Sequence, residues 1–459
     1  MQTEGEDISG AGHSRAERDH AIDVGTILDN SSWSPYQKFV LLLTSLTLVL
    51  DGFDTLALGF AAPALLPELG ISKAALAPVL AVGLLGMSIG AALGGMIGDR
   101  LGRKRALIGS AIVFGLMTGL MATADDVFTL GIFRLLAGFG LGGALPNAAA
   151  LVAEFTPKHR RSLAVTASIV CIPVGGVVGG FVAASVLEPF GWRGLFAIAG
   201  SAPLVLAVIL AFLLPESPRF LLRRGTNSAT VRRTLSKMGI NIPADAELVD
   251  RAEAPVQGNS AKALFGSTYR RDTIALWTAF FACLLSVYMS YNWLPTMLSE
   301  AGFDLATSST GLLAFNVGAI AAAIGAAALI GRFGSKLPML VLALGGAVGA
   351  LILIFVPMDP NSPRLWLILA LGFEGGCIAG VQTILFALAA NVYPTSIRAT
   401  GVGGAGGIGR TGAVLSSFVG AAALAAAGST GFYLVIAGAM LTVAVGIALV
   451  TRHVKGRQT

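Results

Sequence analysis

Long apolar stretches, separated by short polar and charged breaks, form the dominant pattern of this sequence. A membrane-spanning helix needs about 20 mainly apolar residues, and stretches of that length recur about twelve times. The pattern therefore predicts an all-α membrane protein with twelve transmembrane helices. The predicted spans are residues 36–60, 76–97, 105–123, 128–153, 162–186, 194–214, 273–298, 310–330, 337–357, 365–391, 400–427 and 431–451.

Polar residues gather at the two ends of the chain and in its middle. Residues 1–35 mix acidic, basic and small side chains without the charged-then-apolar order of a cleavable signal, so we expect a solvated tail. Residues 215–272 form the longest polar interval and divide the spans into six and six. We therefore predict bundles at 36–214 and 273–451, joined by a central loop at 215–272 and followed by a C-terminal tail at 452–459.

The two halves also resemble each other in sequence. The segment around the fourth span can be laid on the segment around the tenth at one constant offset of 237 positions. This offset matches the pairs Gly143 with Gly380, Pro157 with Pro394 and Arg161 with Arg398. Two repeated six-helix halves are typical of transporters whose site lies near the membrane midplane and opens to each side in turn.

Composition agrees with a membrane protein. Hydrophobic residues make up 55% of the chain and charged residues 12%, whereas about 25% is usual for soluble domains. Most of the 59 glycines lie in the apolar runs, where small residues let helices pack closely. Cys171, Cys283 and Cys377 lie in apolar spans at no metal-binding spacing, so we expect packing residues, with no disulfide, metal or cofactor.

The net charge of +6 is distributed unevenly. Basic residues cluster at 100–105, 158–161 and 219–237, which follow the second, fourth and sixth spans, while the intervening connections are mixed or acidic. By the positive-inside rule, both termini and the central loop are then cytoplasmic. The charge is interpreted as an orientation signal, and no nucleic-acid partner is expected.

Two carboxylates lie inside the first apolar span. Asp51 and Asp54 are three residues apart, so they share one helix face about a turn from each other. Each would cost roughly 2.5–3.5 kcal/mol at the centre of a lipid-facing helix, so both are expected to face the bundle interior. All four histidines lie in tails or loops, which makes these acids the leading candidates for proton coupling. The alternative is that they only satisfy partners within the bundle.

Three further charged residues lie well inside predicted spans, away from their ends. Arg134 is expected in the same membrane half as Asp51, where an ion pair would keep a carboxylate ionised until the partner moves. A static salt bridge is the alternative. In the second half, Glu374 and Arg410 both come near the midplane. Glu374 is a further proton-coupling candidate, and Arg410 either binds a substrate carboxylate bidentately or neutralises Glu374.

Uncharged polar and aromatic residues complete the predicted substrate site. Rings and an amide crowd the outer part of the seventh span and suit a planar, hydroxylated ligand, although an interfacial aromatic belt explains Trp293 equally well. Amides in the fourth, eighth and tenth spans either link helices or face the cavity. The predicted substrate-binding residues besides Arg410 are Tyr288, Tyr291, Asn292, Trp293, Asn147, Asn316 and Gln382.

The segment "GGMIGDRLGRKR" between the second and third spans resembles the signature loop of the major facilitator superfamily. Asp99 can pair with Arg100 and Arg103 there, in a cytoplasmic latch between helices. In the second half "GRFGSKLP" places Ser335 where the acid would stand, so a symmetric latch is not expected. The remaining gating candidates, all at the cytoplasmic ends of spans, are Glu154, Arg161 and Arg398.

Within that superfamily the chain resembles the aromatic acid:proton symporters. The resemblance rests on "DGFD", "RLLAGFGLGGALPN", "LPESPRFL", "YNWLPTML" and "SIRATGVGGAGGIGR". It implies two pseudo-symmetric six-helix bundles in a bacterial inner membrane, and import of a small aromatic carboxylate such as hydroxybenzoate, benzoate or hydroxyphenylpropionate together with protons. Lipid is then the remaining partner, and we expect a functional monomer.

Other classes of protein fit the sequence less well. A carrier for another organic anion or a sugar, or a proton-antiport drug exporter, is the alternative within transport. An enzyme or a receptor would need a nucleophile with its base, a metal cluster, a phosphate loop or a long soluble output domain, and the sequence contains none of these patterns.

Overall fold

Ten long helices form the membrane-spanning part of the protein. The computed structural model describes residues 21–225, 228–243, 246–250, 264–356 and 364–454. In that part of the chain, ten helices are long and apolar enough to cross a membrane. They are α3 (Pro35–Glu68), α4 (Lys73–Leu101), α5 (Arg103–Met121), α6 (Val127–Phe155), α7 (Lys158–Leu213), α11 (Arg270–Glu300), α12 (Leu305–Phe333), α13 (Lys336–Phe355), α14 (Arg364–Val392) and α15 (Thr395–Leu449).

Two of these helices are broken in the middle. The break in α7 lies at Gly191, with φ 65°, and the break in α15 lies at Ala427 and Gly428, the glycine with φ 56°. Positive φ favours glycine because it has no Cβ. The two glycines are 237 positions apart. Each break separates two membrane-length helices, so the described helices supply the twelve predicted spans.

The repeat is also present in the packing of the helices. A Cβ on Gly138 of α6 would lie 2.2 Å from the backbone oxygen of Gly83 in α4, and one on Gly375 of α14 would lie 2.1 Å from the oxygen of Phe315 in α12. Gly375 follows Gly138 by the same 237 positions. Both helix pairs therefore approach so closely that only glycine fits, as expected where small residues direct packing in membranes.

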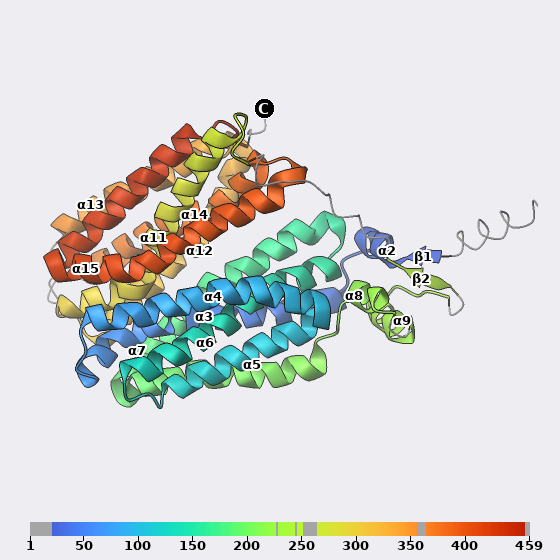
Figure 1. The fold of residues 1–459 in the computed structure, drawn as a ribbon, viewed down its shortest axis with the longest axis horizontal. Helices are drawn as coiled ribbons and strands as arrows, with labels where there is room; N and C mark the ends of the chain where they lie inside the picture. The colour runs from blue at the N-terminus through green and yellow to red at the C-terminus, as the bar shows by residue number, and fades with distance from the viewer. Residues whose placement is uncertain (1–20, 226–227, 244–245, 251–263, 357–363, 455–459) are drawn as a thin grey trace, which may run out of the picture.

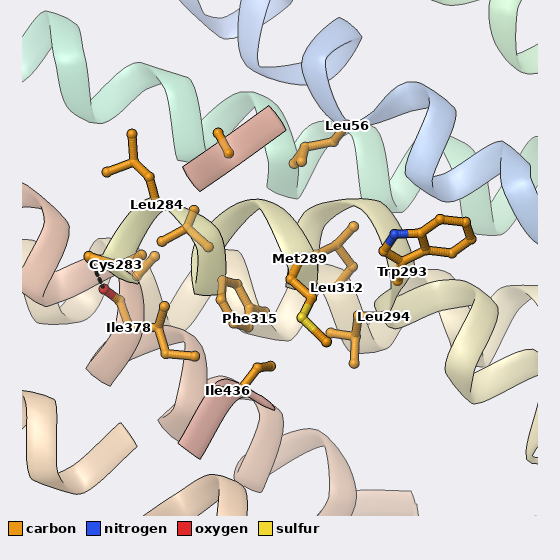
Figure 2. Packing of buried hydrophobic residues seen from close by; sticks show 14 of the residues in the cluster. Leu56, Cys283, Leu284, Met289, Trp293, Leu294, Leu312, Phe315, Ile378 and Ile436 are labelled. Carbon is orange, nitrogen blue, oxygen red and sulfur yellow. Dashed lines mark hydrogen bonds between the residues drawn. The ribbon is translucent and has the colours of Figure 1, made fainter. Parts of the chain in front are cut away.

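The two bundles lie side by side (Figure 1). Helices α3 to α7 form the first bundle and α11 to α15 the second, with contacts between α3 and α11, α4 and α15, and α7 and α12. A Cβ on Gly59 of α3 would lie 2.1 Å from the oxygen of Tyr291 in α11. Helix α11 lies at the centre of the apolar core, where Met289 and Leu294 are buried with residues from α12, α14 and α15 (Figure 2).

Short elements gather at one end of the first bundle (Figure 1). They are β1 (Ala21–Asp23), α2 (Val24–Asn30), α8 (Pro218–Arg223), α9 (Ser228–Lys237) and β2 (Glu247–Val249). We call this end, which also carries the basic α4–α5 and α6–α7 connections, the basic end. Strands β1 and β2 pair in parallel, Ala21 with Glu247 and Asp23 with Val249.

The solvated tail expected for residues 1–35 is wrong for the described part, residues 21–35. Val24 and Leu28 of α2 are buried. Asp29 pairs with Arg161 at the start of α7 and, at 2.7 Å, with Arg219 of α8. Helix α2 has only seven residues, so it produces no apolar run of membrane length. Its one charged residue, Asp29, is neutralised by cations far along the chain.

The second bundle closes its corresponding end with the residues that follow α15. Thr451 donates hydrogen bonds to Asp272 of α11 through its backbone nitrogen, at 2.8 Å, and its hydroxyl, at 3.0 and 2.9 Å. Asn391 of α14 donates to the Arg452 carbonyl at 3.2 Å. The described start of the expected tail at 452–459 is therefore bonded to the bundle.

Candidate functional site

A buried ion pair joins α3 to α6. Arg134 Nη1 lies 3.1 Å from Asp54 Oδ1, and the guanidinium also donates to the backbone oxygens of Asp54 and Thr55 at 3.3 and 3.0 Å. Thr118 of α5 donates to Asp54 Oδ2 at 2.5 Å. Asp54 and Arg134 are 0% and 4% exposed. The ion pair that the sequence allowed is present, and both oxygens of Asp54 have partners.

Asp51 lies one turn earlier on α3 in a different environment. It is 3% exposed, and its Oδ1 has no hydrogen-bond partner among the described residues. The charges that act on it are those of Asp54, Arg410 and Arg134. A Cβ on the intervening Gly52 would lie 2.0 Å from the oxygen of Ile172, so glycine lets α7 pack directly against this part of α3.

Arg410 brings a cation from the second bundle to the same place. It is half-buried on α15, and its Nη1 donates to the Met87 carbonyl of α4 at 2.9 Å, so it bridges the bundles. Its charge acts on Asp51. Within the described part of the chain no hydrogen bond or ion pair joins Arg410 to Glu374. The alternative in which Arg410 neutralises Glu374 is therefore not supported.

Two tyrosines of α11 line the same interface. The rings of Tyr288 and Tyr291 meet edge to face with centroids 5.8 Å apart, and Tyr291 meets Phe315 of α12 at 5.9 Å. Tyr288 interacts electrostatically with Arg410, Asp51 and Arg134. Four helices thus converge where the two bundles touch. We call Asp51, Asp54, Arg134, Tyr288 and Arg410 the interface cluster.

The cluster combines the chemistry needed to bind an anion and a proton. It holds two guanidinium groups, which suit carboxylates because their donors form a planar fork. It also holds one acid with both oxygens engaged and one acid with a free oxygen. Among the described residues no group of His, Cys, Asp and Glu could hold a metal ion. The site is therefore suited to reversible binding of a charged solute.

Three of the predicted substrate residues are engaged elsewhere in this structure. Trp293 is fully buried and donates from Nε1 to the Ser417 carbonyl at 3.1 Å, and Asn292 contacts the Ser417 hydroxyl at 3.5 Å. These bonds link α11 to α15 inside the second bundle, so an interfacial belt is wrong for Trp293. Asn147 of α6 donates to the Gly94 carbonyl of α4 at 2.8 Å. The helix-linking alternative describes Asn147.

The remaining candidates of the second bundle have other surroundings. Asn316 is buried at the contact between α12 and α7, where it donates to the Leu312 carbonyl at 2.9 Å. Gln382 is half-buried on α14. Glu374 is 2% exposed, and the groups that it acts on are Cys377 and Tyr433, within the second bundle. Among the described residues no hydrogen bond or ion pair joins these three residues to the interface cluster.

The predicted gating residues of the first bundle form a network at the basic end. Arg103 lies 2.5 Å from Asp99 and 3.4 Å from Glu154, which ties α4, α5 and α6 together. Arg161 donates to the Ala153 carbonyl at 2.9 Å, in addition to its pair with Asp29. These contacts agree with a latch made of charged groups.

Two other predicted gating residues make only backbone contacts. The Arg100 carbonyl accepts a hydrogen bond from Arg224, which follows α8. Arg398, which the repeat matches to Arg161, is exposed and donates to the Tyr393 carbonyl at 3.3 Å. Neither side chain forms an ion pair within the described residues.

Sequence reasoning missed two acids of the basic network. Glu216 accepts hydrogen bonds from the backbone nitrogens of Lys104 and Ser217 at 3.2 and 3.0 Å, so it holds the turn between α4 and α5. Glu216 belongs to the segment "LPESPRFL", whose acid could have indicated a partner in the basic loops. Asp29 was missed because it lay in the segment expected to be solvated.

The position assigned to Ser335 is wrong. Gly102 and Gly334 both end a helix with positive φ, 104° and 76°, which aligns the two turns and puts Ser335 at the place of Arg103 and Gly331 at the place of Asp99. Ser335 donates its backbone nitrogen to the Val454 carbonyl at 3.0 Å and accepts from the Val454 nitrogen at 3.0 Å. At this turn the second bundle therefore has backbone and hydroxyl bonds where the first has ion pairs, and its ion pair at this end joins Arg452 to Asp272 at 3.7 Å.

His453 belongs to the same uncharged network. Its Nδ1 lies 3.2 Å from the Ser335 hydroxyl and its Nε2 lies 3.1 Å from the Ile447 carbonyl. Burial lowers the pKa of the ring because it removes water from the charged form. His453 is thus held in place by polar contacts to two neighbouring segments.

At the opposite end an ion pair connects the bundles. Lys73 Nζ, at the start of α4, lies 2.5 Å and 2.8 Å from the carboxylate oxygens of Glu300 at the end of α11. Both residues lie in connections between predicted spans. The pair holds the two bundles together at the end away from the basic network.

Comparison with known proteins places this geometry in a family. The chain matches the profile of the Major Facilitator Superfamily over residues 44–403 and 276–459. The chain belongs to the Major Facilitator Superfamily. The superfamily signature recognised in the α4–α5 turn is thus carried by the Asp99 and Arg103 pair described above.

Curated relatives in the superfamily are transporters of aromatic acids. The chain is 38% identical to the 4-hydroxybenzoate transporter PcaK of Pseudomonas aeruginosa over 88% of this chain and 90% of the relative. It is 36% identical to a gallate transporter of Pseudomonas putida with the same two coverages. A benzoate transport protein of Acinetobacter baylyi is 33% identical over 86% of this chain and 85% of the relative.

A solved structure with the same fold is that of a D-xylose-proton symporter. It superposes with a TM-score of 0.71 at 21% identity and covers 92% of this chain and 100% of the symporter. At this identity the likeness establishes the superfamily fold, and the predicted architecture of two six-helix bundles is confirmed.

Proposed function

We propose that this protein imports small aromatic carboxylates together with protons across a bacterial inner membrane by alternating access. The observation that carries the proposal is the interface cluster, in which Asp51 and Asp54 with Arg134 of the first bundle meet Arg410 and Tyr288 of the second. A site shared by two bundles changes its exposure when the bundles rock. The relatives named for 4-hydroxybenzoate, gallate and benzoate support the substrate class.

Within this proposal Arg410 binds the substrate carboxylate and the tyrosines of α11 contact the ring. Arg410 already reaches across the interface to a backbone oxygen, and a carboxylate would accept its donors more strongly because the bond is charge-assisted. Tyr288 interacts with Arg410, and the ring of Tyr291 meets that of Tyr288 edge to face. Aromatic acids offer exactly these two chemistries, a carboxylate and a flat face.

Orientation and gating complete the proposal. The basic end faces the cytoplasm together with both termini, since basic residues favour that side. The Asp99, Arg103 and Glu154 network governs opening at this end, and the Lys73–Glu300 pair governs the other. Each chain works as a monomer, because a single chain contributes every residue of the interface cluster.

Uptake into right-side-out vesicles tests the function. An imposed inward proton gradient should drive accumulation of labelled 4-hydroxybenzoate, and a protonophore should abolish it. Unlabelled benzoate and gallate should compete, whereas xylose and a cationic dye should not. Arg410→Gln should lose binding, while Arg410→Lys should retain part of it because the charge remains but the planar fork is lost. Competition by xylose alone would redirect the proposal to sugars.

A further inference from the structure

The two acids of the interface cluster differ in how fully they are bonded. Asp54 Oδ1 is paired with Arg134 and Oδ2 accepts from Thr118, so both oxygens are used. Asp51 Oδ1 has no partner, although the residue is 3% exposed. A buried carboxylate oxygen without a hydrogen bond is costly. Asp51 is therefore the acid with an open position for a proton.

The cation beside Asp51 also reaches the second bundle. Arg410 is the first cation in its electrostatic surroundings, followed by Arg134, whose Nη1 is already paired with Asp54. Helix α11 faces Asp51 with Tyr288, and α7 faces it with the uncharged stretch around Ile172. Arg410 is therefore the cation whose position most affects the charge of Asp51.

A count of charges connects this geometry to the bound substrate. With Asp51 and Asp54 ionised and Arg134 and Arg410 protonated, the cluster is neutral. A carboxylate that binds Arg410 adds one negative charge in a region of low dielectric, where uncompensated charge is expensive. One proton on Asp51 restores neutrality, and it comes from the same side of the membrane as the substrate.

We propose that Asp51 takes up the coupled proton, one for each carboxylate that binds Arg410, while Asp54 stays ionised in its pair with Arg134. This assignment rests on the proposed function and deepens it. The substrate carboxylate and ionised Asp51 compete for Arg410. When the substrate binds Arg410, protonation of Asp51 is therefore favoured. The loaded site is uncharged and can pass through the occluded state, and no covalent bond is made or broken.

Proton uptake by the purified protein tests the assignment directly. The full chain in weakly buffered detergent solution receives 4-hydroxybenzoate, benzoate or gallate at a pH where the acid is ionised, and an indicator dye reports protons taken up per acid bound. We expect about one proton per carboxylate for the wild type, by thermodynamic linkage. Asp51→Asn should still bind but take up none, and its affinity should no longer fall about tenfold per pH unit.

Two further variants separate the acids. Asp54→Asn leaves Arg134 buried without its acid, so that variant is at risk of not folding. Thr118→Val is the milder change: it removes one hydrogen bond to Asp54 and keeps the ion pair with Arg134. Proton uptake by Thr118→Val should therefore persist. Glu374→Gln neutralises a buried acid outside the cluster and should also leave the proton count at one. Loss of uptake in Glu374→Gln, or its persistence in Asp51→Asn, would overturn the assignment.

The outcome also distinguishes failure of this inference from failure of the proposed function. If the wild type binds an aromatic acid without taking up a proton, the role of Asp51 is wrong and aromatic acid transport stands. If none of the three acids binds, the proposed substrate class is itself wrong. Exchange of labelled for unlabelled acid across liposomes, without any pH gradient, should survive in Asp51→Asn because no net proton movement is required.

Discussion

Three equivalent positions in the two bundles carry opposite kinds of side chain. The repeat offset of 237 positions takes Asp51 and Asp54 of α3 onto Tyr288 and Tyr291 of α11, and it takes Arg134 onto Leu371. One bundle therefore has a buried ion pair where the other has aromatic and apolar contacts. The backbone packing is shared, whereas the chemistry is divided: the first bundle supplies titratable acids and the second supplies rings and a cation.

The ends of the bundles differ in the same way. At the turn between its second and third helices the first bundle has ion pairs around Arg103, whereas the second has backbone and hydroxyl bonds around Ser335. The ion pair at this end of the second bundle joins Arg452 to Asp272 instead. Repetition thus preserves glycine contacts and helix breaks while polar residues diverge. A pseudo-symmetric scaffold does not require a pseudo-symmetric mechanism.

Replacing Arg134 of the first bundle with leucine, the residue at the equivalent position 371 of the second bundle, should have the largest effect. Arg134→Leu leaves Asp54 buried without its cation, which should destabilise the protein by about 3–5 kcal/mol. Thermal unfolding in detergent and vesicle uptake would measure the loss. Leu371→Met, at the equivalent position, should cost under about 1.5 kcal/mol. Equal stability of the two variants would contradict the comparison.

The shared scaffold should respond equally in both bundles. Gly138→Ala and Gly375→Ala each force a Cβ against a carbonyl oxygen at 2.2 and 2.1 Å, so each should destabilise by about 1–3 kcal/mol. The measurement is the unfolding temperature in detergent. Gly109→Ala and Gly438→Ala are matched controls, because neither position has a neighbour within 4 Å. If only one of Gly138→Ala and Gly375→Ala were strongly destabilising, the two glycine contacts would not be equivalent.

The two tyrosines that replace the acids should differ from each other. Tyr288 interacts with Arg410 and Asp51, so Tyr288→Phe should weaken substrate binding by about 0.5–1.5 kcal/mol, the value of one hydrogen bond. Tyr291→Phe keeps the ring that meets Phe315 and should have a smaller effect. Competition binding with 4-hydroxybenzoate would measure both. A larger loss for Tyr291→Phe would place the substrate nearer α12.

The smallest expected effect concerns two equivalent helix caps. Ser72 caps α4 through a bond from Ala75, and Asp304 caps α12 through a bond from Thr307. The bonds from Thr307 and the charge of Arg364 lower the pKa of Asp304. Its capping contribution is therefore present above the usual carboxyl pKa of about 3.9 and is lost as the pH falls through the lower folded value.

Hydrogen exchange between pH 5 and 3 would measure this difference. Exchange in the first turn of α12 should accelerate relative to α4 as the pH falls, after correction for intrinsic rates. Asp304→Ser, which copies the cap of the first bundle, should remove the difference. Equal behaviour of the two turns in the wild type would mean that the charge on Asp304 has no part in capping.

The sequence predicted most of the fold because the bilayer imposes simple rules. Membrane-length apolar runs located the spans, and the repeat found the equivalent prolines at the starts of α7 and α15. Asp54 with Arg134 was predictable since buried charges in a membrane need partners. The same reasoning could not tell which acid would be paired, because both lie on one helix face.

What escaped prediction depends on contacts between distant segments. Nothing near Trp293 in the sequence indicates that its indole meets a carbonyl of α15. Ser335 was placed wrongly because the two turns were not aligned by the glycines that end the preceding helices. Asp29 finds its cations 132 and 190 positions later, which no local pattern reveals.

The pairing of β1 with β2 sets an order for the synthesis of this protein. Residues 21–23 can acquire their partner only after residues 247–249 have been made, by which time all six spans of the first bundle have left the ribosome's active centre. Strand β1 must therefore wait for β2 while the first bundle inserts. A tag fused close to Ala21 would compete with this late closure, and translation stopped before residue 247 would yield an inserted bundle whose basic end is still open.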